Sequence, residues 1–564
     1  MRLRGLAEAG VATLLAAGLT IVLTYPLAFG LDRLGRLQTD DGRLSIWNVA
    51  WVAHALTTAP LGVYDANIFY PHLDALAFSE ANLGAGVLAI PAWMTTHNPY
   101  TAHNSVVLVA FVLAALGGYY LGRYLTGSRA AGAVAGVLFA FCPYIFARTA
   151  HIQLLMTAGL PFSLLAFHRL VDRQTVGRAV GLGLVLWAQA LSCAYYGIFA
   201  ALTIGLATLF FAVTRGLWRR VDYWVGIGLA AFVSVALTAP FFLPYIRIQE
   251  NAGFERTLDD ARMYSADVGA WLASSAWAHR WWLSALGGFN EVLFPGGLLI
   301  ALGVWGAILG LKKARIEGHE GSEGHEGHEG HEERATRDVT AFYILLALLA
   351  FWASFGPKAG LYTLLFDTIP VFSFLRAPAR MGLLVSLSLA ALASVSVAHL
   401  VRGQRRGTLV GGLLVVAAAA ELMAAPLTTL REAEPVARAY QVLATLPTGP
   451  VVEFPYFYRR TDFPRHAYYM LNSTAHWMPL VNGYSDHIPE DFRETVVPLS
   501  SFPSRESFGI LARIGARYVV FHLDLYDRRL RARLMDRLDT YAPYLRPLVQ
   551  EDDVWLYEIV DWPN

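Results

Sequence analysis

The stretch that decides the fold is GLAEAGVATLLAAGLTIVLTYPLAFG at residues 5–30, which is followed directly by the polar stretch LDRLGRLQTDDGRLS at 31–45. A helix that crosses a bilayer needs about 20 consecutive apolar residues, so residues 5–30 are long enough to span one. The polar stretch carries two adjacent acids, Asp40 and Asp41. Carboxylates placed against a membrane span usually have a chemical or ionic role. The pair therefore indicates a candidate functional site beside the first span.

The composition of the whole chain agrees with a membrane protein. Of the 564 residues, 55% are hydrophobic and 15% are charged, whereas soluble domains carry about 25% charged residues. The formal net charge is +1, which argues against nucleic acid as a partner. The expected solvent of most of the chain is the lipid bilayer.

Basic residues set the expected orientation of eleven apolar stretches. Lys and Arg cluster in every second connection between these stretches, and the positive-inside rule places such connections in the cytoplasm. The N-terminus is then cytoplasmic and the C-terminal part extracytoplasmic. The expected spans are 5–30, 103–124, 130–147, 153–170, 178–195, 197–214, 222–245, 291–311, 339–356, 380–400 and 408–425.

Two shorter apolar segments in the first outer loop, 31–102, do not fit as crossings. They are SIWNVAWVAHAL at 45–56 and NLGAGVLAIPAWMTT at 82–96, and we expect helices that lie at the membrane surface. Their tryptophans Trp47, Trp51 and Trp93 would suit an aromatic belt. The loop is thus predicted to be a structured platform.

The remaining connections and the C-terminal segment complete a two-domain layout. We expect a transmembrane domain at 1–425 and an extracytoplasmic α/β domain at 426–564, with strands at 451–455, 517–522 and the closing VWLYEIV, and a helix at 504–515. Two further outer loops are expected at 246–290 and 357–379. A cytoplasmic linker at 312–338 is rich in His, Glu and Gly; it could bind a metal, but its composition favours an unstructured linker.

The acids of the first outer loop can have either of two roles. One aspartate of the Asp40–Asp41 pair can face a site while its neighbour caps the following helix; otherwise both are only helix-start charges. The functional reading is a general base or a metal ligand. Glu80, just before the second surface helix, is a candidate second acid, or else a cap.

Two arginines at the outer end of the tenth span form a candidate anion site. Arg376 and Arg380, in LRAPAR, carry permanent charges beside lipid, and guanidinium groups suit phosphate oxygens; the alternative is snorkelling toward headgroups. Weaker candidates for substrate contact lie in other outer segments, and in the C-terminal domain an ordinary loop is the alternative. These candidates are Arg148, His151, Arg262, His279, Tyr484, Asp486 and His487.

The acidic TDDGR motif in a long first outer loop, the stretch DANIFYPHLDALAFSE and the LRAPAR element resemble those of bacterial proteins of the GT-C superfamily. These are integral-membrane glycosyltransferases that use polyprenyl-phosphate sugars as donors. The resemblance implies that Asp40 or Asp41 is the catalytic base and that Arg376 or Arg380 holds the lipid phosphate. It also implies a bacterial inner-membrane enzyme that transfers a sugar to an extracytoplasmic glycan, lipid or protein.

The chain departs from the metal-dependent members of that superfamily. They carry a spaced Asp-x-Asp and a later Glu-x-Asp, and neither spacing occurs at the matching loops. We therefore expect a metal-free inverting displacement with no cofactor. Two other classes of protein stay open: a transporter or flippase for anionic lipids, and a non-catalytic membrane accessory protein. A transporter should show internal repeats and charges near mid-membrane, and the sequence has no obvious repeat.

Overall fold

The computed structural model describes residues 2–252, 257–286, 288–316 and 326–563, which divide into two compact units. The first unit comprises Met1–Phe29, Val107–Leu243 and Gln249–Thr428, and the second comprises Gly30–Val106, Pro244–Ile248 and Thr429–Asn564. This division differs from the two domains expected from the sequence, because the first outer loop groups with the C-terminal segment. The reason is direct backbone pairing between them, described below.

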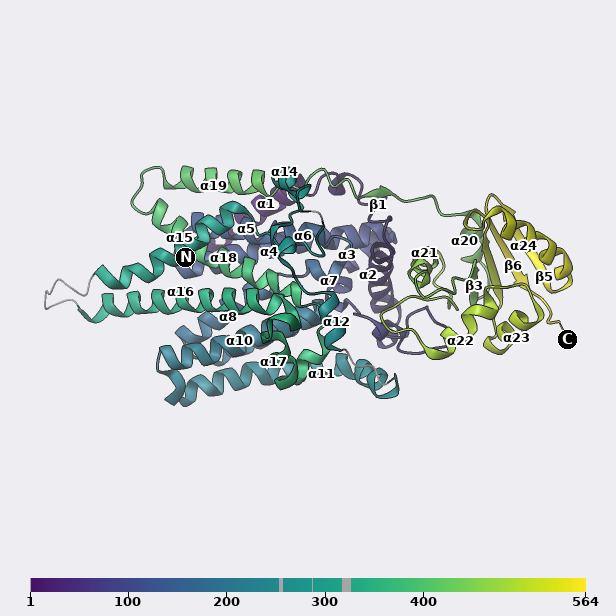
Figure 1. The fold of residues 1–564 in the computed structure, drawn as a ribbon, viewed down its shortest axis with the longest axis horizontal. Coiled ribbons are helices and arrows are strands. Elements are labelled where there is room, and N and C mark those ends of the chain that lie inside the picture. Colours follow the sequence, from purple (N-terminus) through teal and green to yellow (C-terminus); the bar gives the residue numbers. More distant parts are fainter. Residues whose placement is uncertain (1, 253–256, 287, 317–325, 564) are drawn as a thin grey trace. The chain divides into compact units, whose positions relative to one another are not determined.

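The first unit is a bundle of helices (Figure 1). Eight helices of the described residues are long and apolar enough to cross a membrane. Together with the shorter ones, the α-helices of this unit are α1 (Arg2–Leu23), α4 (Pro99–Thr126), α5 (Arg129–Ala140), α6 (Pro143–Ala147), α7 (Ile152–Leu155), α8 (Gly159–Asp172), α9 (Val176–Ser192), α10 (Ala194–Thr214), α11 (Val221–Ala252), α12 (Leu258–Met263), α13 (Val268–Leu272), α14 (Arg280–Leu283), α15 (Gly297–Ile316), α16 (Glu326–Ser354), α17 (Leu361–Thr368), α18 (Gly382–Val401) and α19 (Gly407–Glu421). The first residues of α4 and a short part of α11 belong to the second unit.

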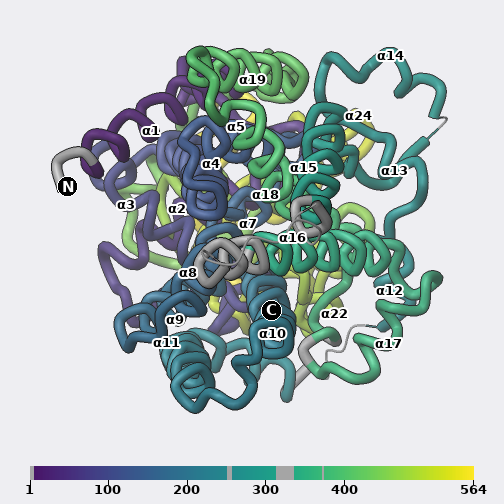
Figure 2. The backbone as a smooth tube through the Cα atoms, turned by 90° about the vertical axis from the view of Figure 1, so that its left-hand side faces the viewer, coloured from purple at the N-terminus to yellow at the C-terminus, as the bar shows by residue number. Residues whose placement is uncertain are grey.

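Close helix packing forms the core of the bundle. Helix α18 packs against α5, α15 and α16 (Figure 2). At the α15–α18 contact, a Cβ on Gly306 would lie 1.9 Å from the carbonyl oxygen of Leu392, so only glycine fits there. Small residues that allow such close approach are typical of helix contacts in membranes.

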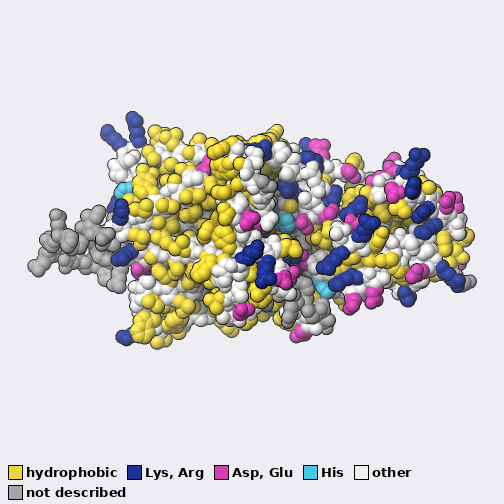
Figure 3. Space-filling view, in the orientation of Figure 1, with side chains coloured by type: hydrophobic (Ala, Val, Ile, Leu, Met, Phe, Trp, Pro, Cys, Tyr) yellow, Lys and Arg dark blue, Asp and Glu magenta, His cyan; other side chains and the backbone are white. Residues whose placement is uncertain are grey.

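Apolar side chains predominate on the face of the bundle that Figure 3 shows. Large side chains such as Leu14, Phe232 and Val235 are exposed by 74%, 70% and 66%. A wide apolar surface of this kind requires lipid as its solvent. The chain is an integral membrane protein.

Three further expected spans coincide with shorter apolar helices. These are Val176–Ser192, Gly297–Lys312 and Gly407–Glu421, and the total of eleven crossings stays a prediction. Of the His-rich linker, residues 317–325 lie outside the described residues. From Glu326 the chain is helical, as the start of α16, and so differs from an unstructured linker there.

The second unit contains the predicted α/β fold. Strands β3 and β4 are parallel, and β6 and β5 extend the sheet in antiparallel fashion, in the order β3-β4-β6-β5. The expected strands and the expected helix at 504–515 are confirmed, and β5 is an addition. The elements are β3 (Val451–Phe454), β4 (Tyr518–His522), β5 (Leu545–Glu551), β6 (Val554–Ile559), α2 (Asp40–Thr58), α3 (Leu83–Thr96), α20 (Arg438–Leu443), α21 (Ala467–Asn472), α22 (Glu490–Leu499), α23 (Arg505–Ile514) and α24 (Arg528–Thr540).

Backbone hydrogen bonds join the first outer loop to the C-terminal segment. Strand β1 (Leu34–Gly35) pairs with β2 (Arg431–Glu432). The Leu480 amide donates to the Asn67 carbonyl at 2.8 Å, and the Tyr70 amide donates to the Leu480 carbonyl at 2.9 Å. These bonds hold residues about 400 positions apart in one folded body.

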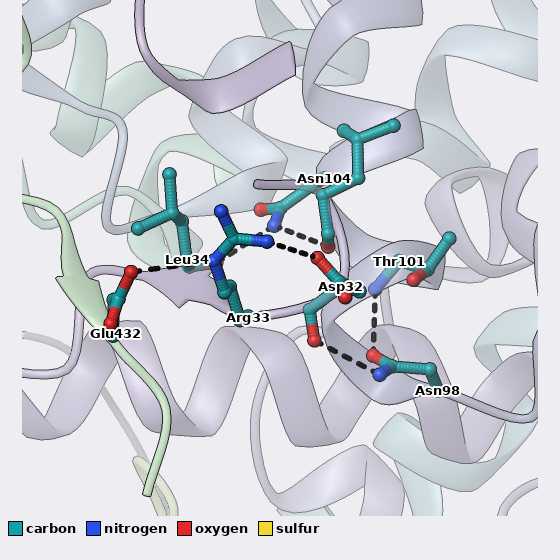
Figure 4. A network of polar contacts seen from close by, with 8 residues as sticks. Asp32, Arg33, Leu34, Asn98, Thr101, Asn104 and Glu432 are labelled. Carbon is teal, nitrogen blue, oxygen red and sulfur yellow. Dashed lines mark hydrogen bonds and ion pairs between the residues drawn. The ribbon is translucent and has the colours of Figure 1, made fainter. Parts of the chain in front are cut away.

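A polar network anchors the start of this loop (Figure 4). Asn104 of α4 donates through Nδ2 to the carbonyls of Leu31 and Leu34 at 3.0 and 2.7 Å. The guanidinium of Arg33 contacts Asp32 and Glu432, each at 3.3 Å. The chain segment that leads to Asp40 is therefore held by α4 on one side and by the C-terminal segment on the other.

The expected aromatic belt is wrong for the three tryptophans that suggested it. Trp47, Trp51 and Trp93 are only 1%, 8% and 3% exposed. The indole of Trp47 donates to Asn67 Oδ1 at 3.2 Å, and that of Trp51 donates to the Val63 carbonyl at 2.9 Å. Buried partners satisfy these N–H groups, so the tryptophans belong to the protein core.

Candidate active site

The Asp40–Asp41 pair begins helix α2, in the second unit. The cap is Thr39, with extended backbone, whose Oγ1 accepts from the Gly42 amide at 3.2 Å. The expectation that an aspartate caps the helix is therefore wrong, because the threonine hydroxyl already fills that role. Asp40 and Asp41 occupy the first turn, where the helix dipole favours negative charge.

Asp40 is oriented by a side chain one turn along the same helix. Its Oδ1 is 3.0 Å from Nη1 of Arg43, and the two side chains are 28% and 26% exposed. The guanidinium of Arg43 lies over the ring of Tyr468, 5.6 Å from its centroid. Asp40 is thus held at a partly open surface, with Arg43 bridging α2 and α21.

Asp40 opens onto a polar cavity of about 260 Å³ within the second unit. Its lining combines three carboxylates, two guanidinium groups, a phenol and two apolar side chains. The lining residues are Asp40, Arg43, Glu434, Phe457, Arg465, Tyr468, Asp524 and Leu525. Asp41 is not among them, so the two adjacent aspartates have different surroundings.

A buried network supports one wall of the cavity. Glu453, inside β3, accepts through Oε2 from the Tyr440 hydroxyl at 2.5 Å and lies 2.7 Å from Nε2 of His522. Burial, together with the Glu453 carboxylate, raises the pKa of Tyr440 well above its usual value, so this phenol stays a donor. The ring of His522 meets that of Tyr468 at 5.3 Å. The network therefore fixes the position of Tyr468.

Sequence reasoning missed most of the cavity. No local motif marks Glu434, Arg465 or Asp524, because only the tertiary fold brings them to Asp40. Glu453 does carry a signal, since a charged residue inside a buried apolar strand is rarely tolerated without a partner.

Glu80 lies beside α2 in the same unit but not in the cavity lining. Its carbonyl accepts from Nδ2 of Asn48 at 3.3 Å and from Nδ2 of Asn82 at 3.1 Å. The Ala81 amide donates to the Tyr245 hydroxyl at 2.9 Å. The backbone at Glu80 is therefore rigidly held against α2.

Arg376 and Arg380 belong to the first unit and lie on aromatic rings. The Arg376 guanidinium is 5.4 Å from the centroid of Tyr264, and that of Arg380 is 4.4 Å from the centroid of Tyr195. The Tyr195 hydroxyl accepts from the Ala377 amide between them. Within the part of the chain that the structure describes, Arg380 forms no ion pair with a carboxylate. A half-buried guanidinium on a tyrosine ring suits an external anion.

Three of the weaker candidates in the first unit are engaged by neighbouring side chains. Arg148 pairs with the buried Glu291 and lies over the Tyr144 ring. Arg262 pairs with Asp259 at the surface. His279 is buried, and its Nδ1 and Nε2 lie 2.7 Å from Ser274 Oγ and 3.1 Å from Glu421 Oε1. Its ring nitrogens both have protein partners. His151 is half-buried at the start of α7.

Of the three candidates in the C-terminal loop, His487 contacts the first outer loop. The His487 amide donates to the Phe78 carbonyl at 2.9 Å, and its ring meets Phe78 at 5.2 Å. Burial, together with Arg493 and His72, lowers the pKa of His487. Tyr484 is half-buried and Asp486 is exposed. None of these three lines the Asp40 cavity.

The described residues contain no group of three His, Cys, Asp or Glu side chains placed to hold a metal ion. This includes the three carboxylates of the cavity, which share its surface without forming a ligand set.

No protein-family model matches the sequence, and neither does any curated protein. Solved structures do match the fold. One is the archaeal oligosaccharyltransferase AglB from Archaeoglobus fulgidus in complex with an inhibitory peptide and a dolichol-phosphate, with 14% identity and a TM-score of 0.50 over 96% of this chain and 72% of that chain. The apo form of the Archaeoglobus fulgidus oligosaccharyltransferase gives 15% identity and a TM-score of 0.48, again over 96% and 72%. ArnT from Cupriavidus metallidurans gives 14% and 0.37, over 91% of this chain and 93% of that chain.

The AglB match extends over nearly the whole chain and shows a shared fold. The resemblance to GT-C membrane glycosyltransferases drawn from the sequence is therefore confirmed at the level of the fold.

Proposed function

We propose that the protein is a membrane glycosyltransferase that moves a sugar from a polyprenyl-phosphate donor to an extracytoplasmic acceptor. The observation that carries this proposal is Asp40, an acid fixed in the first turn of α2 and open to a polar cavity, in a chain with the fold of an oligosaccharyltransferase. The matched AglB structure contains a dolichol-phosphate, which supports a lipid-phosphate donor here.

Asp40 would act as the general base. It takes the proton of an acceptor hydroxyl while the hydroxyl oxygen attacks the anomeric carbon of the donor sugar. The bond from that carbon to the phosphate oxygen breaks as the new glycosidic bond forms, and the configuration inverts. Its neighbour Asp41 adds negative charge at the helix start, outside the cavity. Glu80, whose backbone is held against α2, would assist as a second acid by adding negative charge near the start of the site.

Arg376 and Arg380 would hold the leaving lipid phosphate. Negative charge develops on the lipid phosphate as its bond to the anomeric carbon breaks, and a guanidinium neutralises this charge. The tyrosine rings beneath both arginines keep the charged groups in place without cancelling the charge. The leaving phosphate then needs no general acid, and no metal ion or other cofactor is required.

The proposed setting is the bacterial inner membrane, with the N-terminus in the cytoplasm. The alternating clusters of Lys and Arg between apolar stretches support this orientation. It places the second unit, which carries Asp40 and the C-terminal sheet, outside the cytoplasm, where polyprenyl-phosphate sugars meet their acceptors.

The test is turnover by the purified full chain in nanodiscs that contain a panel of polyprenyl-phosphate sugars, with glycan, lipid and peptide acceptors added. We expect release of free polyprenyl phosphate from at least one donor. The same panel in proteoliposomes separates the transporter alternative: movement of intact donor across the bilayer, without release of phosphate, would establish transport and overturn the proposed function.

A further inference from the structure

The Asp40 cavity offers hydrogen-bond acceptors and donors in the same small space. Asp40, Glu434 and Asp524 supply carboxylates, which only accept, and Arg43 and Arg465 supply guanidinium groups, which only donate. A sugar hydroxyl is one donor and two acceptors at once. A ring with several hydroxyls therefore matches this mixed lining better than a ligand that only donates or only accepts.

The charges of the cavity select against acidic ligands. Three carboxylates face two guanidinium groups, and Arg43 is already paired with Asp40. Glu434 and Asp524 form no ion pair with any residue that the structure describes. A phosphate, nucleotide or uronic acid would meet uncompensated negative charge.

The uncharged part of the lining consists of one phenol and two apolar side chains. Burial, together with the carboxylates of Glu434 and Asp524, raises the pKa of Tyr468 to about 12, so its hydroxyl remains a donor. Only Phe457 and Leu525 are apolar, and Arg465 covers the Phe457 ring at 4.1 Å from its centroid. Peptides and lipid chains are usually recognised by apolar pockets or strand edges, which this lining does not provide.

The size of the cavity limits the occupant. Its volume of about 260 Å³ lies below the range of roughly 300–1,000 Å³ for sites that enclose drug-sized ligands. One or two sugar rings are of suitable size. The walls are rigid, because Tyr468 rests on the buried Glu453–His522 network and Asp40 on the capped start of α2.

We propose that this cavity binds a non-acidic sugar residue of the acceptor, with one of its hydroxyls presented to Asp40. That this cavity is the acceptor site rests on the proposed function. The cavity specifies a carbohydrate acceptor, in place of a peptide or a lipid. Glu434 and Asp524 act as acceptors for ring hydroxyls, and Tyr468 and Arg465 act as donors to ring oxygens.

The test is saturation-transfer NMR on the full chain in nanodiscs, without donor. The probes are maltose and chitobiose, with cellobiuronic acid and a tripeptide of similar mass for comparison. We expect signals from at least one of the two non-acidic disaccharides. Glu434→Gln and Asp524→Asn should each weaken its binding about tenfold, the effect of losing one charge-assisted hydrogen bond. Glu494→Gln, which changes an exposed acid of α22 outside the cavity, should leave binding unchanged.

Three results would overturn the inference: no signal from either non-acidic disaccharide, a stronger signal from the uronic acid or the tripeptide, or binding that Glu434→Gln and Asp524→Asn leave intact. Release of polyprenyl phosphate from the donor panel is scored separately on the same preparation. Turnover without saccharide binding refutes the carbohydrate site alone, and saccharide binding with no turnover of any donor refutes the glycosyltransferase alone.

Discussion

Replacing Asp40 with asparagine separates chemistry from folding. The amide keeps the size of the side chain and an oxygen that can still accept from Arg43 Nη1, and the Thr39 cap is untouched. Two contributions to folding stability are lost. The charge at the helix start contributes about 0.3–1 kcal/mol, and the partly exposed ion pair with Arg43 contributes about 0.2–1 kcal/mol. The expected cost in folding free energy is therefore below about 2 kcal/mol.

The cost to the reaction should be much larger. A positioned general base contributes typically 10²–10⁴-fold, and each factor of ten corresponds to about 1.36 kcal/mol of activation free energy. Asp40→Asn should thus raise the barrier by roughly 2.7–5.4 kcal/mol. The variant should fold, bind donor and turn it over at least about a hundredfold more slowly.

The assay is release of polyprenyl phosphate under single-turnover conditions in the presence of acceptor, with thermal unfolding measured on the same preparations. Asp41→Asn is the matched comparison, because it removes the neighbouring charge from the same helical turn outside the cavity, and a smaller loss is expected. Glu494→Gln, on α22 outside the cavity, controls for the removal of an exposed acid. Turnover by Asp40→Asn within threefold of the unaltered protein would refute the assignment of Asp40 as base, as would an equal loss in Asp41→Asn.

Three further predictions concern the anion site, pH and metal ions. Arg380→Gln should lower donor turnover about 10²–10³-fold, the range for loss of one group that stabilises developing charge, and should weaken binding of free polyprenyl phosphate; unchanged phosphate binding would exclude Arg380 from the site. Burial, and the nearby Arg465, lower the pKa of His466 to about 4 from 6.5, so the unfolded chain binds the proton more tightly and stability falls below pH 6.5, by about 2 kcal/mol at pH 5. His466→Gln should reduce the fall in unfolding temperature between pH 7 and pH 5, and an identical fall would contradict this linkage. Turnover should persist after EDTA treatment, and loss restored by a divalent cation would contradict the metal-free mechanism.

The long elements could be predicted from the sequence because their signals are local. The apolar stretch at 5–30 and the strand at 517–522 are recognisable from composition and period alone. The same is true of α2 and α3, whose helical segments at 45–56 and 82–96 were expected. What covers these two helices cannot be predicted in this way, because an apolar helix face indicates burial without indicating whether protein or lipid covers it. That is why Trp47 and Trp51 suggested a membrane belt and lie instead in a protein core.

The candidate site was only half predictable for a related reason. Asp40 stood out because it follows a span, and Arg380 because it precedes one. Glu434 and Asp524 are exposed acids with no distinguishing local sequence, and only β1–β2 pairing and the packing of α2 on α21 bring them to one cavity. Contacts between residues about 400 positions apart leave no local trace in a single sequence.

The grouping of the first outer loop with the C-terminal segment has a consequence for specificity. Asp40 is on the first turn of α2, Tyr468 is on α21, and Asp524 lies in the short 3-10 helix Leu523–Leu525 that follows β4, so one compact unit holds both the base and the acceptor-binding groups. A hydroxyl bound between such fixed groups is presented to the base at high effective concentration. Acceptor choice should then reside in this unit, while donor affinity depends on Arg376 and Arg380 of the other unit. Substitutions at Glu434 or Asp524 should therefore change the KM for acceptor and leave the affinity for polyprenyl phosphate alone, and those at Arg380 should do the reverse.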